Sequence, residues 1–278
     1  MHRSSAQASR VALSRSELSS LREVRGMLEC RFGLNFPSFH DDWLYSQICH
    51  LSHERGLASV GLLKDFLNSR GPEDDAWMDL LHAVTVHETY FYRNGPTAEK
   101  ALKSLGQSCT EVNFLSVGCS YGHEVYTAFL IARSLYPGIS VKGTGIDISR
   151  ACIDVASAGE FPVTSDFAKL RTLLNANDYC ETGGSIRFSP TVHEHLTFKT
   201  GNALDPDICP EGVYQVIFCQ NCLTYYDEPT RMEVAERLAN KLDAGGLLVF
   251  AGAELIGNRP RSTVSLSNEW PQILVKEF

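Results

Sequence analysis

The fold of this chain is decided by Asn113-Phe-Leu-Ser-Val-Gly-Cys-Ser-Tyr-Gly-His-Glu-Val-Tyr-Thr127, followed further along by Thr144-Gly-Ile-Asp-Ile148. The first stretch is an apolar run that ends in small residues and leads into an amphipathic segment. Small residues after a parallel strand let a ligand approach the backbone, and an acid ending the next strand can accept both ribose hydroxyls. The pattern therefore predicts a nucleoside site around Gly118 and Asp147.

The predicted ligand has a ribose but no pyrophosphate. The glycines do not form the dinucleotide pattern GxGxxG, and Glu124 lies inside the turn, where it would repel a pyrophosphate. S-adenosylmethionine is the common ligand of this kind, so it is the predicted cofactor. A glycine-rich loop alone also occurs in ordinary turns; the acid at the end of the second strand favours the nucleoside site.

Composition excludes several classes of function. The 278 residues are 44% hydrophobic and 21% charged, which is typical of a globular protein, and the net charge is −8. An acidic chain is unsuited to tracking phosphates, so we expect no nucleic-acid partner. No apolar run approaches the roughly 20 residues of a membrane span, and we expect no direct membrane insertion.

The cysteines favour a reducing compartment. There are nine of them, an odd number, and several lie in apolar runs. We therefore expect reduced core cysteines and a cytoplasmic protein. Cys219-Gln-Asn-Cys222 has the CxxC spacing, but no second ligand pair follows at zinc-site spacing. No metal site is predicted.

The region before the glycine-rich loop shows helical periodicity without strand patterns. We expect residues 1–15 to be disordered, residues 16–95 to form a small helical domain, and residues 96–111 to form a linker helix. The predicted helices cover Ser16–Leu28, Asp41–Leu51, Val60–Leu67, Asp74–His87 and Thr97–Leu105. Asn94-Gly95-Pro96 breaks the pattern between the helical domain and the linker.

Residues 112–278 alternate between strand and helix patterns. Strands are predicted at 113–118, 141–147, 196–200, 214–219 and 246–251, and helices at 125–135, 150–157 and 229–242. This alternation is typical of an α/β fold with a mostly parallel sheet, in which ligands bind at the carboxyl ends of the strands. The insertion at 159–195 does not fit the alternation, although 185–189 has the pattern of a small strand.

Two further motifs resemble the CheR-type chemotaxis receptor methyltransferases. Thr85-Val-His-Glu-Thr-Tyr-Phe-Tyr-Arg-Asn94 precedes the α/β region, and Phe218-Cys-Gln-Asn-Cys-Leu-Thr-Tyr-Tyr-Asp227 lies within it. The resemblance runs from about residue 20 to residue 278 in the same order of motifs. It implies a Rossmann-like S-adenosylmethionine-dependent methyltransferase sheet after a helical receptor-recognition domain. It also implies transfer of methyl groups to receptor glutamates, in the cytoplasmic coiled-coil region of a chemoreceptor-like protein.

The resemblance also implies the site residues. The cofactor would be bound by His87, Thr89, Arg93, Gly118, Glu124, Asp147, Asn202, Ala203, Gln220 and Asn221. In this set Thr89, Arg93 and Glu124 correspond to the amino-acid end of the cofactor, Asp147 to the ribose, and Asn202-Ala203 to the adenine. Arg93 and Tyr225 correspond to the residues nearest the transferred methyl group, and are the implied catalytic residues.

This set contains no obvious catalytic base, which suits a carboxylate acceptor. A glutamate is already ionised at neutral pH, so methyl transfer requires alignment and exclusion of water rather than proton removal. Arg93 can grip one carboxylate oxygen and Tyr225 can orient the other. Simpler interpretations stay open: Arg93 as a surface charge after a helix, and Tyr225 as a core aromatic.

Departures from the family pattern leave the acceptor open. His87, His123 and Gln220 replace an Asn, an acid and an Arg of the usual motifs. The segment Asp41–Leu51, which matches the basic receptor-binding helix, has two acids and no Lys or Arg. The alternatives are a regulatory protein that binds S-adenosylmethionine without methyl transfer, or a methyltransferase for another acceptor on the same fold.

Overall fold

The computed structural model describes residues 13–71, 74–106, 109–208, 214–251, 254, 264–266 and 273–276. Most of the N-terminal segment that is predicted to be disordered, residues 1–12, lies outside the described residues. The chain divides into two compact units, residues 1–86 and 87–278. Residues 87–95, which the sequence pattern places in the helical domain, therefore belong to the second unit, and so does the predicted linker helix.

The first unit is helical throughout its described part. Its helices are α1 (Arg15–Phe32), α2 (Asp41–Glu54), α3 (Val60–Asn68) and α4 (Asp75–Val84). A capping box opens α1: the Ser14 hydroxyl accepts from the Glu17 N–H, and the Glu17 carboxylate accepts from the Ser14 N–H. Gly33, with φ of 72°, ends this helix in the left-handed conformation. Each of the four helices contributes fully buried leucines to the core of this unit.

The last helix of the first unit is shorter than its sequence pattern indicates. The prediction extended α4 to His87, but it ends at Val84. Thr85 is extended, and its hydroxyl donates to the Leu81 carbonyl oxygen at 2.8 Å. The Thr85 N–H donates to the same carbonyl oxygen at 3.1 Å, so both bonds end on one carbonyl of the last turn. As a consequence, the motif from His87 to Asn94 begins in extended backbone, outside any helix.

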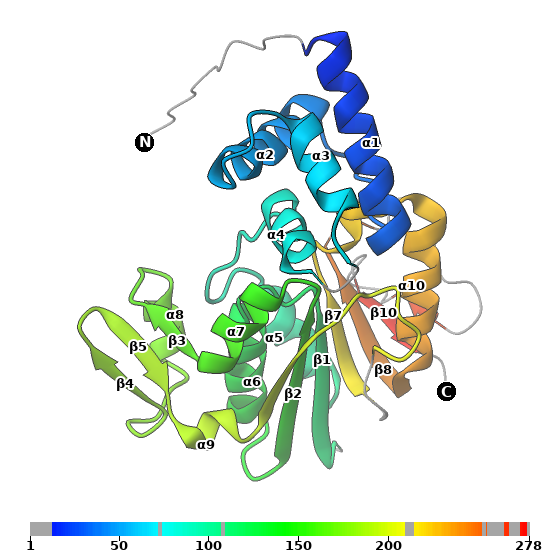
Figure 1. The fold of residues 1–278 in the computed structure, drawn as a ribbon. Helices are drawn as coiled ribbons and strands as arrows, with labels where there is room; N and C mark the ends of the chain where they lie inside the picture. The colour runs from blue at the N-terminus through cyan, green and yellow to red at the C-terminus, as the bar shows by residue number, and fades with distance from the viewer. Residues whose placement is uncertain are drawn as a thin grey trace, which may run out of the picture. The chain divides into compact units, whose positions relative to one another are not determined.

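The second unit is built on a seven-stranded sheet with the order β6-β2-β1-β7-β8-β10-β9 (Figure 1). Its strands are β1 (Glu111–Val117), β2 (Ser140–Asp147), β6 (Leu196–Thr200), β7 (Tyr214–Cys219), β8 (Leu242–Phe250), β9 (Val264–Leu266) and β10 (Ile273–Lys276). The first five are parallel, and β10 is antiparallel to both of its neighbours. Strands β9 and β10 have no counterpart in the predicted strand pattern.

Helices pack along the parallel part of this sheet. They are α5 (Gly95–Ser104), α6 (His123–Leu135), α7 (Arg150–Ala158) and α10 (Glu228–Asn240). Helix α6 packs on strands β1 and β2 and on helix α5. Helix α7 packs on β2 and β6, and helix α10 packs on β8 (Figure 1). The α/β fold with a mostly parallel sheet is thus confirmed. Within the described residues, no helix has both the length and the apolar character needed to cross a bilayer.

The insertion between β2 and β6 forms a second, smaller sheet. It has three antiparallel strands in the order β3-β5-β4, seen beside α7 in Figure 1. Its elements are β3 (Glu160–Pro162), α8 (Phe167–Arg171), β4 (Tyr179–Thr182), β5 (Ser185–Phe188) and α9 (Pro190–His193). Of the three strands, only β5 is predicted from the sequence. Strand β3 has three residues and pairs with β5 across a long segment, and strand β4 has four residues and is joined to β5 by the two-residue turn Gly183-Gly184.

The strand order of the large sheet indicates where a ligand would bind. Successive strands run outward in one direction from β1 through β2 to β6, and in the other direction from β7 to β8. Ligands of such sheets bind outside the carboxyl ends of the strands where this reversal occurs. Gly118, Asp147, Gly201 and Gln220 end or directly follow β1, β2, β6 and β7.

Candidate nucleoside and methyl-transfer site

Asp147 ends β2 with its carboxylate fixed by two backbone groups. Oδ2 accepts from the Ser120 N–H at 2.7 Å, and Oδ1 accepts from the Ser149 N–H at 2.9 Å. The residue is only 8% exposed. Each carboxylate oxygen has a second lone pair, so this group can still accept hydrogen bonds from a vicinal diol. The position and chemistry suit the ribose of a nucleoside.

The glycine-rich loop is held against the neighbouring strands. Gly118 has φ of 75°, and its N–H donates to the Ile146 carbonyl oxygen at 2.8 Å. A Cβ at Gly118 would lie 2.4 Å from the Cys222 Cβ, so only glycine fits between β1 and the turn after β7. Ser120 is also left-handed, with φ of 50°. Its bond to Asp147 stabilises this conformation and couples the loop to the acid.

Glu124 lies in the first turn of α6, beside the end of β1. Its Oε1 accepts from the Ser116 hydroxyl at 2.8 Å. Burial raises the pKa of Glu124 to about 7, and the Glu254 charge adds to the rise, whereas Ser116, Asn94 and Arg93 oppose it. A carboxylate with this pKa gains free energy from a cation placed next to it. An ammonium group of a ligand would supply that cation.

Arg93 and Tyr225 come from separate loops of the second unit. The Arg93 guanidinium donates to the Glu88 carbonyl oxygen, and its Nη2 lies 3.6 Å from the Glu88 Oε2. Its side chain is 29% exposed. Tyr225 ends the short helix η1 (Leu223–Tyr225), which follows β7, and is 8% exposed. The positive charge of Arg93 also lowers the pKa of Glu124 slightly, against the larger effect of burial.

The segment that carries Arg93 is anchored by Phe91 and Tyr92. Phe91 is 1% exposed, and its N–H donates to Asp166 Oδ2 at 2.8 Å. Tyr92 has φ of 64°, and its N–H donates to the Thr127 hydroxyl of α6 at 3.1 Å. These contacts tie the motif to α6 and to the insertion. Thr89 precedes this anchor, in the extended stretch between α4 and Phe91.

His123 is the first residue of α6 and packs between two aromatic rings. Its ring centroid lies 4.5 Å from that of Phe91 and 4.7 Å from that of Phe161. Burial lowers the pKa of His123 to about 4. The imidazole is therefore neutral at neutral pH. Its enclosed packing and its neutral form make His123 unsuited to acid–base catalysis.

The predicted adenine pair, Asn202 and Ala203, follows β6. Asn202 Oδ1 accepts from the Leu204 N–H at 3.0 Å and from the Tyr226 hydroxyl at 3.3 Å. The Ala203 carbonyl oxygen accepts from Arg237 Nη1 at 3.2 Å. The Tyr226 bond joins the loop after β6 to the turn after β7. These two loops border the strand ends on either side of Asp147 and Gly118.

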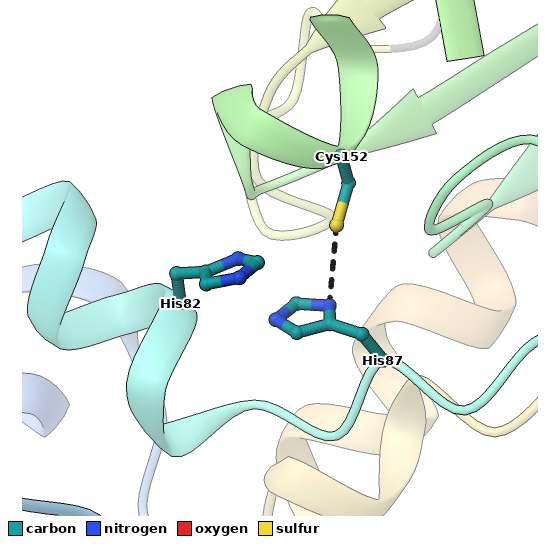
Figure 2. A group of neighbouring side chains, drawn as sticks. All are labelled: His82, His87 and Cys152. Atoms are coloured by element: carbon teal, nitrogen blue, oxygen red, sulfur yellow. Dashed lines mark hydrogen bonds between the residues drawn. The ribbon is translucent and has the colours of Figure 1, made fainter. Parts of the chain in front are cut away.

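His87 contacts the helix that follows Asp147. Its Nδ1 lies 3.2 Å from the Cys152 Sγ of α7, the contact drawn as a dashed line in Figure 2. The Tyr121 ring of the glycine-rich loop lies 5.7 Å from the His87 ring, between centroids. His87, a departure from the family pattern, thus meets both Tyr121 and Cys152 close to the strand end that carries Asp147.

Gln220 and Asn221 occupy the turn after β7. Gln220 is 8% exposed, and within the described residues no hydrogen-bond partner is found for its Nε2. Asn221 is exposed and left-handed, with φ of 64°. Each residue costs free energy in this state. A buried amide such as that of Gln220 needs a hydrogen-bond acceptor, and a non-glycine residue such as Asn221 disfavours positive φ.

Sequence reasoning missed Glu254. This acid follows β8, is 6% exposed, and accepts from the N–H groups of Asn221 and Leu223, both at 2.9 Å. The sequence holds one signal for it, since an acid so close to a buried apolar strand is unusual unless it is paired. The residues that pair with Glu254 cannot be inferred from the sequence, because they bind it through backbone N–H groups.

The described residues suit S-adenosylmethionine. Asp147 offers acceptors for a diol, and Glu124 is an acid that a ligand ammonium would stabilise. The buried Gln220 amide group offers a donor for an acceptor atom of a ligand. S-adenosylmethionine has no pyrophosphate and needs no cluster of cations, whereas the Glu124 carboxylate would repel a ligand that carried a pyrophosphate.

Comparison with known proteins identifies the second unit. Residues 87–270 match the family model described as "CheR methyltransferase, SAM binding domain". This range begins at His87, covers more than half of the chain and contains all of the predicted site residues. S-adenosylmethionine is therefore the cofactor of the matched domain.

Several curated relatives are similar to this chain. A probable biofilm formation methyltransferase, WspC, of Pseudomonas aeruginosa is 30% identical over 203 residues, or 66% of this chain and 47% of the relative. A chemotaxis protein methyltransferase of Borreliella burgdorferi is 22% identical over 268 residues, or 90% of this chain and 92% of the relative. The chain spans about half the length of the WspC relatives that it matches.

Solved structures with similarity to this chain include a SAM-dependent methyltransferase from Thiobacillus denitrificans in complex with S-adenosyl-L-homocysteine. Its TM-score is 0.35 at 17% identity, and the match covers 59% of this chain and 50% of that chain.

Proposed function

Because this chain belongs to the CheR methyltransferase family, we propose that it transfers methyl groups from S-adenosylmethionine to glutamate side chains of a chemoreceptor-like protein, forming glutamyl methyl esters. The observation that carries the proposal is the family match over 87–270, together with the retention of Arg93 and Tyr225 at the family's motif positions. The relatives named as chemotaxis methyltransferases support an adaptation role in a chemosensory pathway.

The proposed cofactor contacts follow from the chemistry of each group. Asp147 would accept the ribose hydroxyls, and Glu124, with Thr89 and Arg93 near it, would hold the amino-acid end. The remaining contacts are assigned to His87 and Gly118, to Asn202 and Ala203 near the adenine, and to Gln220 and Asn221, which close the site. When bound, S-adenosylmethionine supplies an activated methyl group on a sulfonium.

The proposed chemistry asks little more of the protein than alignment. The attacking glutamate is ionised at neutral pH and needs no general base. Arg93 would hold one oxygen of this carboxylate with its planar fork, and the Tyr225 hydroxyl would donate to the other. His123 has no part in the transfer, because it is neutral and enclosed by aromatic rings.

The partner is proposed to be a receptor of a chemosensory-like system, met in the cytoplasm. Helix α2 carries Asp41 and Asp42 in its first turn and no Lys or Arg within its bounds. It therefore lacks the basic surface expected for an acidic receptor coiled coil. The relative named for biofilm formation supports a receptor whose output is other than swimming.

A pH dependence of cofactor binding follows from Glu124. Its pKa is raised to about 7, and an ammonium ligand binds its ionised form, so binding must release a proton below pH 7. Affinity for S-adenosylhomocysteine should therefore be about tenfold weaker at pH 6 than at pH 8, by linkage. Calorimetry at both pH values checks this. Glu254 and Arg93 are the charged groups that act on Glu124.

Two variants assign the pH dependence to one group. Glu124→Gln should bind about tenfold more weakly at pH 8, where it lacks the charge–ammonium attraction, and should lose the pH dependence. Glu236→Gln, which changes an exposed acid of α10, should keep both the affinity and the pH dependence of the wild type. An unchanged pH dependence in Glu124→Gln would show that the ammonium is bound elsewhere.

Labelling of native acceptors tests the proposed function. The chain is incubated with methyl-labelled S-adenosylmethionine and a membrane extract of the native cells, and the labelled band is treated with mild alkali. A glutamyl ester releases its label, whereas a methylated amine keeps it. Base-stable label would exclude glutamate methylation. Binding of the cofactor without labelling of any band would instead favour the regulatory alternative, which His87 and Gln220 motivate as departures from the family pattern.

A further inference from the structure

Glu254 is a buried acid that the proposed chemistry does not use. It follows β8, and its side chain reaches the turn that follows the neighbouring strand β7. Oε2 accepts from the N–H of Asn221 at 2.9 Å and of Ala251 at 3.2 Å, and Oε1 accepts from the N–H of Leu223 at 2.9 Å. One carboxylate therefore joins two adjacent strand ends.

The turn after β7 depends on an acceptor at this place. Asn221 is left-handed, and Leu223 opens η1, so its N–H has no partner within that helix. Without Glu254 the N–H groups of Asn221 and Leu223 would both lose their acceptor, and the loss is costly at Leu223, which is fully buried. Bonds to a carboxylate are also stronger than bonds to a neutral acceptor.

The segment held by Glu254 is the one that carries the predicted methyl-transfer residues. It begins with Gln220 and Asn221 and ends with Tyr225. Within it, Cys222 lies directly against Gly118 of the glycine-rich loop. A shift of this backbone would displace the Tyr225 hydroxyl. Displacements of about 1 Å at a reacting centre are enough to slow alignment-dependent chemistry severely.

We propose that Glu254 is a positioning residue that fixes the Asn221–Tyr225 turn, and thereby the place of Tyr225, without touching the cofactor or the acceptor. The catalytic part of this proposal rests on the proposed methyl transfer, whereas the structural part does not. Glu254 acts through the backbone, so its effect falls on the rate of transfer more than on binding.

Hydrogen exchange and kinetics of the full chain test this role together. Glu254→Gln keeps the shape of the side chain but replaces one acceptor oxygen by an NH₂ group, which would face a backbone N–H donor that it cannot accept from. Amides of the 220–226 segment should then exchange at least about tenfold faster, with exchange in β1 and β2 unchanged. The kcat for methyl transfer should fall about tenfold, and KM for S-adenosylmethionine should stay within about threefold. Glu236→Gln is the matched control, and should resemble the wild type in every measurement.

The two readouts separate the possible failures. Unchanged exchange in the 220–226 segment overturns the proposal, whatever the activity. Faster exchange with an unchanged kcat also overturns it, and leaves the proposed methyl transfer standing. A wild-type protein that labels no acceptor would contradict the proposed function, while exchange still decides whether Glu254 holds the turn. If Glu254→Gln does not fold, Glu254→Asp, which keeps the charge but is one methylene shorter, carries the same measurements.

Discussion

Arg93→Ala should slow methyl transfer by at least about 100-fold, in line with the loss of alignment at a reacting carboxylate. The guanidinium donates to the Glu88 carbonyl oxygen and lies 3.6 Å from the Glu88 carboxylate, so its position is set before an acceptor arrives. Binding of S-adenosylhomocysteine should weaken far less than the rate falls. The assay follows base-labile methyl incorporation into the acceptor, and calorimetry follows the cofactor product.

Two further variants make the Arg93 result specific. Arg93→Lys should rescue poorly, because a point charge cannot reproduce a planar, two-point grip on a carboxylate. Arg187→Ala is the matched control: its side chain is 63% exposed in an ion pair with Glu160, and exposed pairs contribute little. A fully active Arg93→Ala would leave the enzyme class standing and would assign the acceptor carboxylate to another residue.

The parallel part of the sheet was predictable because each strand carries its own signal. The strands predicted at 113–118 and 141–147 are confirmed by β1 and β2. These strands pair in parallel, and the Gly118 N–H donates to the carbonyl oxygen of Ile146, the residue before Asp147. Helix boundaries followed local signals in the same way. Gly33 ends α1, and the Asp227 side chain caps α10 by accepting from the Thr230 N–H at 3.0 Å.

The elements that escaped prediction depend on backbone pairing and local backbone conformation, which residue patterns do not record. Strands β3 and β4 are short and become strands only by pairing with β5. The end of α4 at Val84 was also missed, because helical periodicity does not register that the backbone becomes extended at Thr85. Glu254 could not be assigned to a site from the sequence, because its partners are the N–H groups of Asn221 and Leu223 and backbone groups leave no residue pattern.

Adjacent tyrosines show the same limit within the site. Alternation along a strand or loop predicts that only one of Tyr225 and Tyr226 packs inward. Both are buried, at 8% and 4% exposure, because Tyr225 ends the short helix η1 and the backbone turns before Tyr226. The Tyr226 hydroxyl donates to Asn202, and Tyr225 remains the proposed contact to the acceptor. The motif spacing identified the pair, and only the turn between them distinguishes their roles.

Asp147→Ala should weaken S-adenosylhomocysteine binding by roughly ten- to a hundredfold, since charge-assisted bonds contribute about 1.5–3 kcal/mol each. The structure adds a second effect. Asp147 also accepts from the Ser120 and Ser149 N–H groups, so its removal leaves both without an acceptor and loosens the glycine-rich loop. Calorimetry measures the affinity, and Asp154→Ala, which removes an exposed acid of α7, is the matched control.

A ligand lacking one ribose hydroxyl separates the two effects of Asp147. If the carboxylate accepts from the ribose, the 2′-deoxy analogue of S-adenosylhomocysteine should bind the wild type about tenfold more weakly than the parent ligand. In Asp147→Ala the two ligands should bind almost equally, because the acceptor is gone, whereas a loosened loop would weaken both alike. The difference between these ratios measures the contact itself, as in a double-mutant cycle. Equal ratios in both proteins would mean that Asp147 shapes the loop and leaves the ribose to another residue, and the assignment of the strand-end acid would have to be abandoned.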